Sequence, residues 1–259
     1  MPRILLSNDD GIQAPGLAAL EKALQGLGEL WVVAPAEPQS AKSHALTLHK
    51  CVKISQLGPR RFAVRGTPVD SVYTGIHRIL PGPPDLVVSG INRGANIGED
   101  VHYSGTVAAA REAVLQGYSA IAVSLHVDFA DPIESHNWET AGEQVRRLAA
   151  EVLQRGLAPN CLLNLNVPDI PTSACKGIKA CALGHHFYGP LVEERPDPRG
   201  KGYFKLGGPH MDFGPQVPSE GHFVESGWAS LSPLTVRVTD NAVLKSLADW
   251  GAVDSFHSE

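Results

Sequence analysis

Short apolar runs recur along the N-terminal part of the chain, and each is followed by turn residues and then by an amphipathic or alanine-rich segment. Runs of this kind are typical of strands buried in a parallel sheet. They lie at residues 4–6, 30–34, 85–90, 120–124 and 161–167. Helices are expected over residues 17–27, 67–80, from 104 onward and over 135–154, where apolar positions or capping residues fit a helix. The alternation predicts a doubly wound α/β domain with a mostly parallel sheet and right-handed crossovers.

The remaining segments follow other patterns. Residues 50–65 alternate apolar and polar side chains, which predicts an antiparallel hairpin or edge pair. Residues 184–222 are rich in proline and glycine with little periodicity, so we expect a functional segment or an interaction arm there. Residues 232–238 are expected to form a final strand. A short helix over 241–250 would need a packing partner, for example a second subunit.

Composition narrows the class of protein. The chain has 259 residues, of which 43% are hydrophobic and 19% charged, as in soluble globular proteins. The formal charge of -5 argues against a nucleic-acid polymer as the main partner, but a small phosphorylated substrate remains possible because its field is local. The N-terminus lacks a signal-peptide pattern and no apolar run has the length of a membrane span. We therefore expect a cytoplasmic protein without membrane contact.

Soft metal ligands do not form a recognisable motif. The four cysteines show no CxxC spacing and are interpreted as reduced, mostly structural thiols. The adjacent pair His185 and His186 could contribute to a metal site, but neighbouring residues seldom point at one centre. Hydrogen-bonding or solvent-facing histidines are the simpler interpretation.

Two adjacent carboxylates, Asp9 and Asp10, follow the first apolar run. They are expected at the carboxyl end of the first strand, the edge at which open α/β sheets bind ligands. Adjacent like charges are tolerated when water or a cation lies between them, and oxygen ligands suit Mg²⁺ or Mn²⁺. Because Asn-Asp-Asp-Gly is also good turn chemistry, an ordinary solvated turn is the alternative.

Two later loops are expected at the same edge. The loop at 35–47 carries Ser40, Ser43 and His44, which could reach a metal ion or a substrate, or could belong to a capped, solvated loop. The loop at 91–100 contains glycines and asparagines that allow the backbone to approach a ligand closely.

The tripeptide Ser104-Gly-Thr106 begins the alanine-rich helix. Free N–H groups, two hydroxyls and the positive end of a helix dipole together suit a phosphate group. Ser104 would cap the helix with or without a phosphate, so the cap alone does not identify a site.

Five segments carry a more specific pattern. They are Ile-Leu-Leu-Ser-Asn-Asp-Asp-Gly at 4–11, Gln-Ser-Ala-Lys-Ser-His-Ala-Leu-Thr at 39–47, Gly-Thr-Pro-Val-Asp at 66–70, Val-Ser-Gly-Ile-Asn-Arg-Gly-Ala-Asn-Ile-Gly-Glu-Asp at 88–100 and Tyr-Ser-Gly-Thr-Val-Ala-Ala-Ala at 103–110. In this order the chain resembles the SurE family of survival-protein nucleotidases, from Ile4 to about Val238.

The resemblance implies a metal-dependent phosphatase of nucleoside monophosphates, with the ester at the 5′ or the 3′ carbon. It implies one divalent ion per subunit, Mg²⁺ or Mn²⁺. It also implies a Rossmann-like core, which we place over residues 1–170 because the composition shifts beyond Pro171. Residues 171–259 would complete this core and supply an extended β arm at about 184–222 and a swapped C-terminal element, which would build a homodimer or homotetramer.

Residue by residue, the resemblance assigns metal ligands and a phosphate site. The metal ligands fall on Asp9, Asp10, Ser40 and Asn92, and the positions near the substrate phosphate fall on Asn96, Ser104, Gly105 and Thr106. The family glycine that follows the metal-site serine is Ala41 here. Residues 218–224 resemble a family segment that often reads Thr-Asp-Phe-His-Ala-Val, which aligns His222 with a histidine near the active site. The chain departs from that segment at 219–221.

These assignments predict hydrolysis of a phosphomonoester by a metal-activated water. Asn96 and the donors at 104–106 would meet the charge that develops on the phosphoryl oxygens. One of the two aspartates, or His222, would transfer the proton, and the sequence does not choose among them. The alternatives are a nucleotide-binding regulatory module without turnover and a phosphotransferase that forms a phosphoaspartate.

Overall fold

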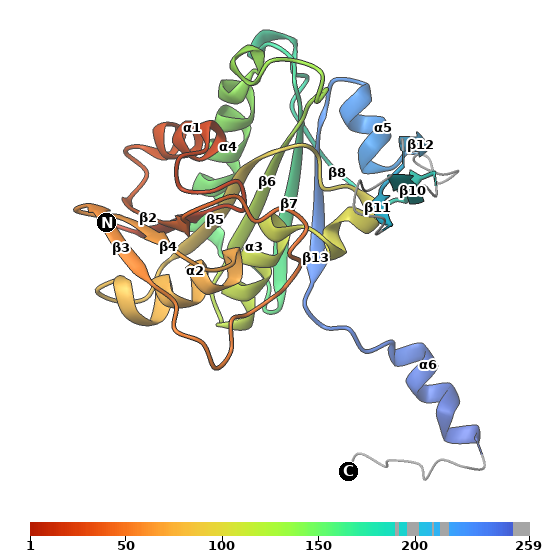
Figure 1. Ribbon diagram of the computed structural model, residues 1–259, viewed down its shortest axis with the longest axis horizontal. Helices are drawn as coiled ribbons and strands as arrows, with labels where there is room; N and C mark the ends of the chain where they lie inside the picture. The colour runs from red at the N-terminus through yellow and green to blue at the C-terminus, as the bar shows by residue number, and fades with distance from the viewer. Residues whose placement is uncertain (190–191, 196–201, 209, 213–217, 251–259) are drawn as a thin grey trace.

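The computed structural model describes residues 1–189, 192–195, 202–208, 210–212 and 218–250. Its centre is a nine-stranded sheet with the order β3-β4-β2-β1-β5-β6-β7-β13-β8 (Figure 1). The strands are β1 Arg3–Ser7, β2 Glu29–Pro35, β3 Ile54–Gly58, β4 Arg61–Val64, β5 Leu86–Arg93, β6 Ala120–His126, β7 Cys161–Pro168, β8 Ile178–Ala180 and β13 Ala229–Thr235. Neighbouring strands are parallel except for the pairs β3 with β4 and β7 with β13, so the predicted mostly parallel sheet is confirmed.

Helices cover both faces of the sheet, with α1 and α4 on one face and α2 and α3 on the other (Figure 1). The helices are α1 Pro15–Leu24, α2 Pro68–Thr74, α3 Gly105–Leu115 and α4 Trp138–Arg155. Leu20 of α1 and Val145 of α4 belong to one buried apolar cluster, and Val72 of α2 and Val107 of α3 belong to another. Two cores separated by one sheet define the doubly wound arrangement that the hydrophobic pattern predicted.

Helix boundaries differ from the expected ones for local reasons. The helix expected over 17–27 ends at Leu24, shortly before Gly26 with its φ of 82°. The helix expected over 67–80 begins where predicted, and the structure adds a capping box, in which the Asp70 N–H donates to Thr67 Oγ1 and the Thr67 N–H donates to Asp70 Oδ2. It then continues as the π-helical turn η1, Gly75–Ile79.

The two sheet edges are built from short strands. The hairpin expected within 50–65 is confirmed by the antiparallel pair β3 and β4, and β4 lies parallel to β2. The final strand, expected over 232–238, covers Ala229–Thr235 instead. It lies between β7 and β8, and β8 forms the other edge of the sheet.

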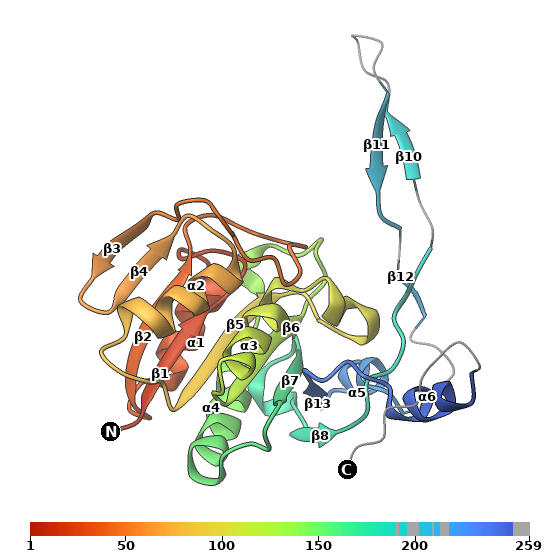
Figure 2. The same cartoon turned by 90° about the horizontal axis from the view of Figure 1, so that it is seen from below.

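The proline-rich segment forms strands rather than a purely irregular arm. β10 (Val192–Arg195) pairs with β11 (Tyr203–Leu206), and β9 (Phe187–Tyr188) pairs with β12 (His210–Asp212), both antiparallel. Figure 2 shows β10 and β11 projecting far from the sheet. The parts of the predicted arm at 190–191, 196–201, 209 and 213–217 lie outside the described residues.

The C-terminal element extends from the body. Helix α6, Asn241–Ser246, contains no buried residue and lies well away from the sheet in Figure 1. Residues 251–259 of the predicted C-terminal element lie outside the described part of the chain. No helix in the described ranges is both long and apolar enough to cross a membrane.

Candidate active site

A cavity of about 520 Å³ opens at the carboxyl ends of β1, β2, β5 and β6. Its lining includes six of the residues predicted for the site, namely Asp9, Asp10, Ser40, Asn92, Asn96 and Ser104. They come from separate strand-end loops and the start of α3, as expected for parallel strands whose loops converge at one edge. The structure therefore brings these six predicted residues together.

Asp9 and Asp10 are held by a tight turn after β1. Asn8 closes this turn, because its Oδ1 accepts the N–H of Gly11 and its Nδ2 donates to the Gly11 carbonyl. Gly11 has a φ of +100°, a conformation that favours glycine. Asp9 is buried and Asp10 is partly buried.

The surroundings oppose the ionisation of both acids. Burial and the neighbouring charge of Asp10 raise the pKa of Asp9 to about 6, although hydrogen bonds with Thr106 lower it. Burial also raises the pKa of Asp10, against the N–H and the positive charge of Arg93. Two crowded carboxylates beside an open cavity are an arrangement that a divalent cation would stabilise.

The N-terminus of α3 packs directly against Asp9. The Thr106 hydroxyl donates to Asp9 Oδ1, and Ser104 Oγ caps the helix by accepting the N–H of Val107 at 3.0 Å. Gly105 leaves no space for a side chain, because a Cβ there would lie 2.7 Å from the Cβ of Asp9. Of the predicted phosphate-site residues at the helix start, Ser104 lines the cavity, whereas Gly105 and Thr106 contact the carboxylate behind it.

The end of β5 supplies Asn92 and the loop that leads to Asn96. The pairing of β5 with β6 becomes irregular between Ser89 and Asn92, a distortion often found beside functional sites. Asn92 Nδ2 donates to the Gly94 carbonyl at 2.8 Å, so the carboxamide oxygen is the atom suited to a cation.

Asn96 is held by a buried network that the sequence did not reveal. Its N–H donates to Asn166 Oδ1, its Nδ2 donates to Ser124 Oγ, and its carbonyl accepts from Asn164 and Asn166. The only signal in the sequence was the pair of asparagines within the apolar run of β7. Side chains from β6 and β7 thus hold the loop that forms this part of the cavity wall.

The loop that carries Ser40 is tied across the cavity to α3 and to η2, Gly98–His102. Ser43 donates from its backbone to the Tyr103 carbonyl at 3.0 Å and from its hydroxyl to the His102 carbonyl at 2.6 Å. His44 Nε2 lies 2.8 Å from Glu112 Oε2. Ser43 and His44 thus hold the loop, and only Ser40 of the three lines the cavity.

The predicted histidines lie elsewhere. His222 is on α5, Glu220–Glu225, with its Nδ1 2.8 Å from Ser219 Oγ, and it is not part of the cavity lining. His185 and His186 contact Glu99 and Asp100 through their Nδ1 atoms. Both are hydrogen-bonded to carboxylates, in line with the simpler interpretation.

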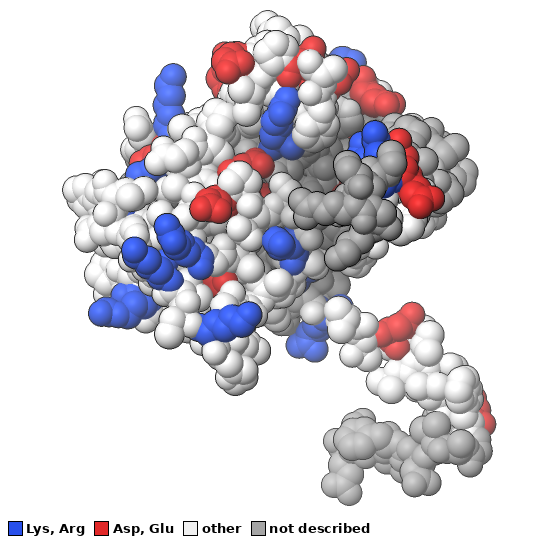
Figure 3. Space-filling view, in the orientation of Figure 1, with Lys and Arg blue, Asp and Glu red and all other residues white. Residues whose placement is uncertain are grey.

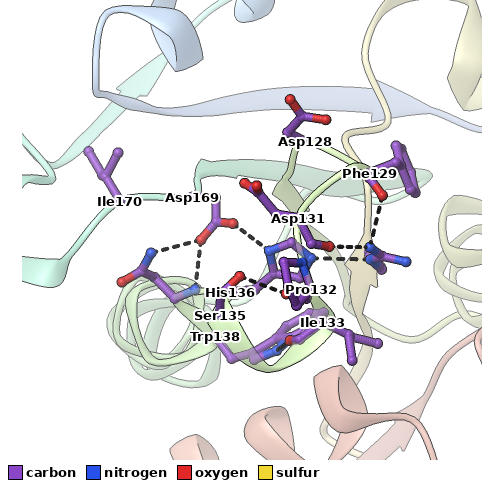
Figure 4. A network of polar contacts seen from close by, with 12 residues as sticks. Asp128, Phe129, Asp131, Pro132, Ile133, Ser135, His136, Trp138, Asp169 and Ile170 are labelled. Carbon is purple, nitrogen blue, oxygen red and sulfur yellow. Dashed lines mark hydrogen bonds and ion pairs between the residues drawn. The ribbon is translucent and has the colours of Figure 1, made fainter.

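Arg93 is a residue of the cavity wall to which the sequence analysis gave no role. Its N–H donates to Asp10 Oδ2 at 3.1 Å, and its Nε donates to His136 Nε2 at 3.2 Å. His136 Nδ1 in turn lies 2.7 Å from Asp169 Oδ2, and Figure 4 shows this chain of contacts. These residues come from three segments far apart in the sequence, so no local pattern could have linked them.

A doubly wound α/β core with paired carboxylates and a capped helix N-terminus around one strand-end cavity places the protein in the Rossmann-like α/β class and suits a phosphorylated ligand. Residues 4–190 match the family described as survival protein SurE. The chain belongs to the SurE family, which confirms the resemblance found in its motifs.

Relatives support this assignment over nearly the whole chain. The 5′-nucleotidase SurE of Geotalea daltonii is 44% identical over 248 residues, which cover 96% of this chain and 98% of the relative. The 5′-nucleotidase SurE of Geobacter metallireducens is 42% identical over 248 residues, which cover 96% of this chain and 97% of the relative. The crystal structure of SurE protein from Aquifex aeolicus superposes with a TM-score of 0.85 at 34% identity, covering 95% of this chain and 98% of that one.

Proposed function

We propose that this chain is a divalent-metal-dependent phosphatase that hydrolyses nucleoside monophosphates to nucleoside and phosphate. The relatives named 5′-nucleotidase SurE support a 5′ ester, and a 3′ ester is a second substrate of the same proposal. The main support is the convergence of Asp9, Asp10, Ser40 and Asn92 on one cavity beside the start of α3.

The donor set fits one Mg²⁺ or Mn²⁺ ion. Two carboxylates, a hydroxyl and a carboxamide oxygen are hard ligands, and a cation would offset the burial that raises the pKa of both acids and the charge of Asp10 that adds to it at Asp9. Within the described ranges, no group of three or more His, Cys, Asp or Glu side chains suits an ion, so the Ser40 and Asn92 oxygens are essential to the proposal. When bound, such an ion would supply Lewis-acid stabilisation of charge on the phosphoryl group.

The chain's own residues would bind and orient the phosphate. Asn96 and the start of α3 at Ser104 present donors and the positive end of a helix dipole at the cavity. Thr106 and Gly105 would hold Asp9 in place from behind. Asp9, Asp10 or His222 would carry the proton, and the position of Asp9 and Asp10 in the cavity lining favours the aspartates.

Phosphate release from AMP with Mn²⁺ or Mg²⁺, with and without EDTA, tests this function directly. We expect turnover that EDTA abolishes and that Asp9→Asn removes almost completely, while Asp249→Asn, an acid on the exposed η5 turn (Leu247–Asp249), leaves it unchanged. Metal-dependent hydrolysis that survives in Asp9→Asn would refute the site. Binding of AMP without release of phosphate would favour a regulatory module, and a trapped phosphoaspartate would favour a phosphotransferase.

The partners and setting complete the proposal. The projecting arm and the exposed α6 support assembly into a homodimer or homotetramer, which light scattering would test. On the face drawn in Figure 3, Lys and Arg side chains are interspersed with uncharged surface and acidic groups, which suits a small substrate better than a nucleic-acid polymer. Four free thiols agree with a reducing, cytoplasmic setting.

A further inference from the structure

Two large aromatic side chains line the cavity yet remain exposed. Phe129 and Tyr103 are each 66% exposed, and both belong to the wall of the cavity that contains Asp9 and Asp10. Aromatic rings on the wall of a polar ligand cavity usually contact part of the ligand. The phosphate site itself has no use for an apolar ring, so the rings indicate a second part of the substrate.

Phe129 is held in place although it is exposed. Its ring packs on the backbone of Gly94, where a Cβ would lie 2.7 Å from the ring's Cζ. The guanidinium carbon of Arg93 lies 5.2 Å from the ring centroid, a cation-π contact. Glycine at 94 therefore makes room for the ring, and Arg93 holds it.

Arg93 is itself fixed by the network of polar contacts in Figure 4. Its Nη2 donates to the carbonyl of Asp131 at 3.0 Å, and its Nε donates to His136. Because His136 Nε2 accepts from Arg93, its Nδ1 must carry the hydrogen that Asp169 accepts. His136 is 5% exposed, so the imidazole that accepts from Arg93 Nε is fixed, and the Asp131 carbonyl holds the other side of the guanidinium.

Arg93 also links the ring to the carboxylates. Its backbone N–H donates to Asp10 Oδ2 while its guanidinium contacts Phe129. One residue therefore contacts both the carboxylate and the ring, and Asp10, Arg93 and Phe129 line the same cavity. A phosphate bound beside Asp10 would place an attached base near Phe129.

We propose that Phe129, supported by Arg93 and Gly94, is the stacking platform for the nucleobase of the substrate. This deepens the proposed function and rests on it, since it places the base of the same nucleoside monophosphate. Stacking on an aromatic face tolerates every base, so the platform selects esters that carry a base over esters that lack one without strong preference among bases. We choose Phe129 over Tyr103, the other exposed ring of the cavity, because Arg93 and Gly94 hold the Phe129 ring in place.

The test compares AMP with ribose 5-phosphate, which lacks the base. Phe129→Ala should lower kcat/KM and binding affinity for AMP by about tenfold, mainly through KM, and change both for ribose 5-phosphate by less than about twofold. Phe129→Trp should retain the wild-type kcat/KM and affinity for AMP. Tyr73→Ala, a change at an exposed aromatic on α2, should alter these values for neither compound. The exposed ring makes loss of the fold in Phe129→Ala unexpected.

Two outcomes would overturn the platform. One is an equal loss for AMP and ribose 5-phosphate, and the other is undiminished AMP affinity in Phe129→Ala. Calorimetric binding of both compounds keeps this result separate from catalysis. If the wild-type protein released no phosphate from either compound, the proposed function would fail, while the ratio of the two affinities would still decide the role of Phe129.

Discussion

The side-chain hydroxyl of Thr106 donates a hydrogen bond to Oδ1 of Asp9, across 97 residues of sequence. This contact connects the first turn of α3 to the loop after β1 and fixes the orientation of a buried carboxylate. It also lowers the pKa of Asp9 against the effect of burial. The start of α3 thus orients the Asp9 carboxylate through Thr106 and lines the cavity through Ser104.

Replacing Thr106 by Val removes this donor at nearly constant volume. We expect kcat/KM for AMP to fall by about tenfold, because the carboxylate loses the hydrogen bond that orients it and favours its charged form. Thr106→Ser keeps the hydroxyl and should retain most activity. The measurement is steady-state phosphate release at saturating Mn²⁺, and equal activity of the Val and Ser variants would contradict the role of the hydroxyl.

Gly105→Ala should damage catalysis more than stability. The added Cβ would meet Asp9 Cβ at 2.7 Å and Oδ2 at 2.9 Å, so the carboxylate must move. Displacing a group that positions the reactants by about 1 Å can cost about a hundredfold in turnover, and we expect a loss of this order if Asp9 is the proposed metal ligand. Gly58→Ala is the matched control, since a Cβ there meets its nearest atom at 3.7 Å. Similar kinetics for the two variants would show that the contact with Asp9 is unimportant.

Much of the fold followed from local pattern. Each apolar run became a strand of the sheet, and α2 begins directly after Thr67, where the sequence placed the start of a helix. Buried parallel strands are recognisable because both of their faces are apolar. The position of β13 between β7 and β8 was not predictable, because strand order depends on packing between distant segments.

The site was predictable only as far as its first contacts with a ligand. Asp9 and Asp10 follow β1, Asn92 lies at the end of β5, and parallel strands bring their ends together. Hydrogen-bond partners such as His136 for Arg93 leave no trace in periodicity, since Arg93 ends β5 and His136 lies in the segment before α4. His222 stays a prediction, as its position on α5 and its contact with Ser219 do not establish a role.

The stability of the metal-free protein should depend on pH through Asp9. Its pKa rises from 3.8 to about 6 on folding, mainly because of burial, so the folded state binds the proton more tightly than the unfolded state. Stability therefore falls as pH rises through this interval. Asp9→Asn avoids this loss and, in EDTA near pH 7.5, should be more stable than wild type by about 1–3 kcal/mol.

Denaturant unfolding in EDTA at several pH values would measure this effect. The difference between Asp9→Asn and wild type should shrink as pH falls toward about 3, below the unfolded pKa of 3.8, where the wild-type carboxyl is mostly protonated in both states. A difference that stays constant with pH would show that charge burial is not its cause. The same variant that gains stability loses turnover, as expected where a site is built for charge rather than for the fold.

His44 should tune metal affinity by holding the loop that carries Ser40. Its Nε2 contacts Glu112 Oε2. Burial opposes ionisation of Glu112, but the hydrogen bonds with His44 and Gln116 and the neighbouring histidines outweigh it, so the pKa of Glu112 is lowered. The Glu112 carboxylate is therefore ionised and can hold His44. His44→Ala removes the link between the loop and α3. We expect about tenfold weaker Mn²⁺ binding, with turnover at saturating Mn²⁺ nearly unchanged, as for other residues that orient a ligand from behind.

His77→Ala is the control, because His77 lies on η1, outside the loop, and contacts the same network only through Gln116. Titration of activity with Mn²⁺ measures the difference, and equal Mn²⁺ dependence in the two variants would show that the loop keeps Ser40 in place without His44.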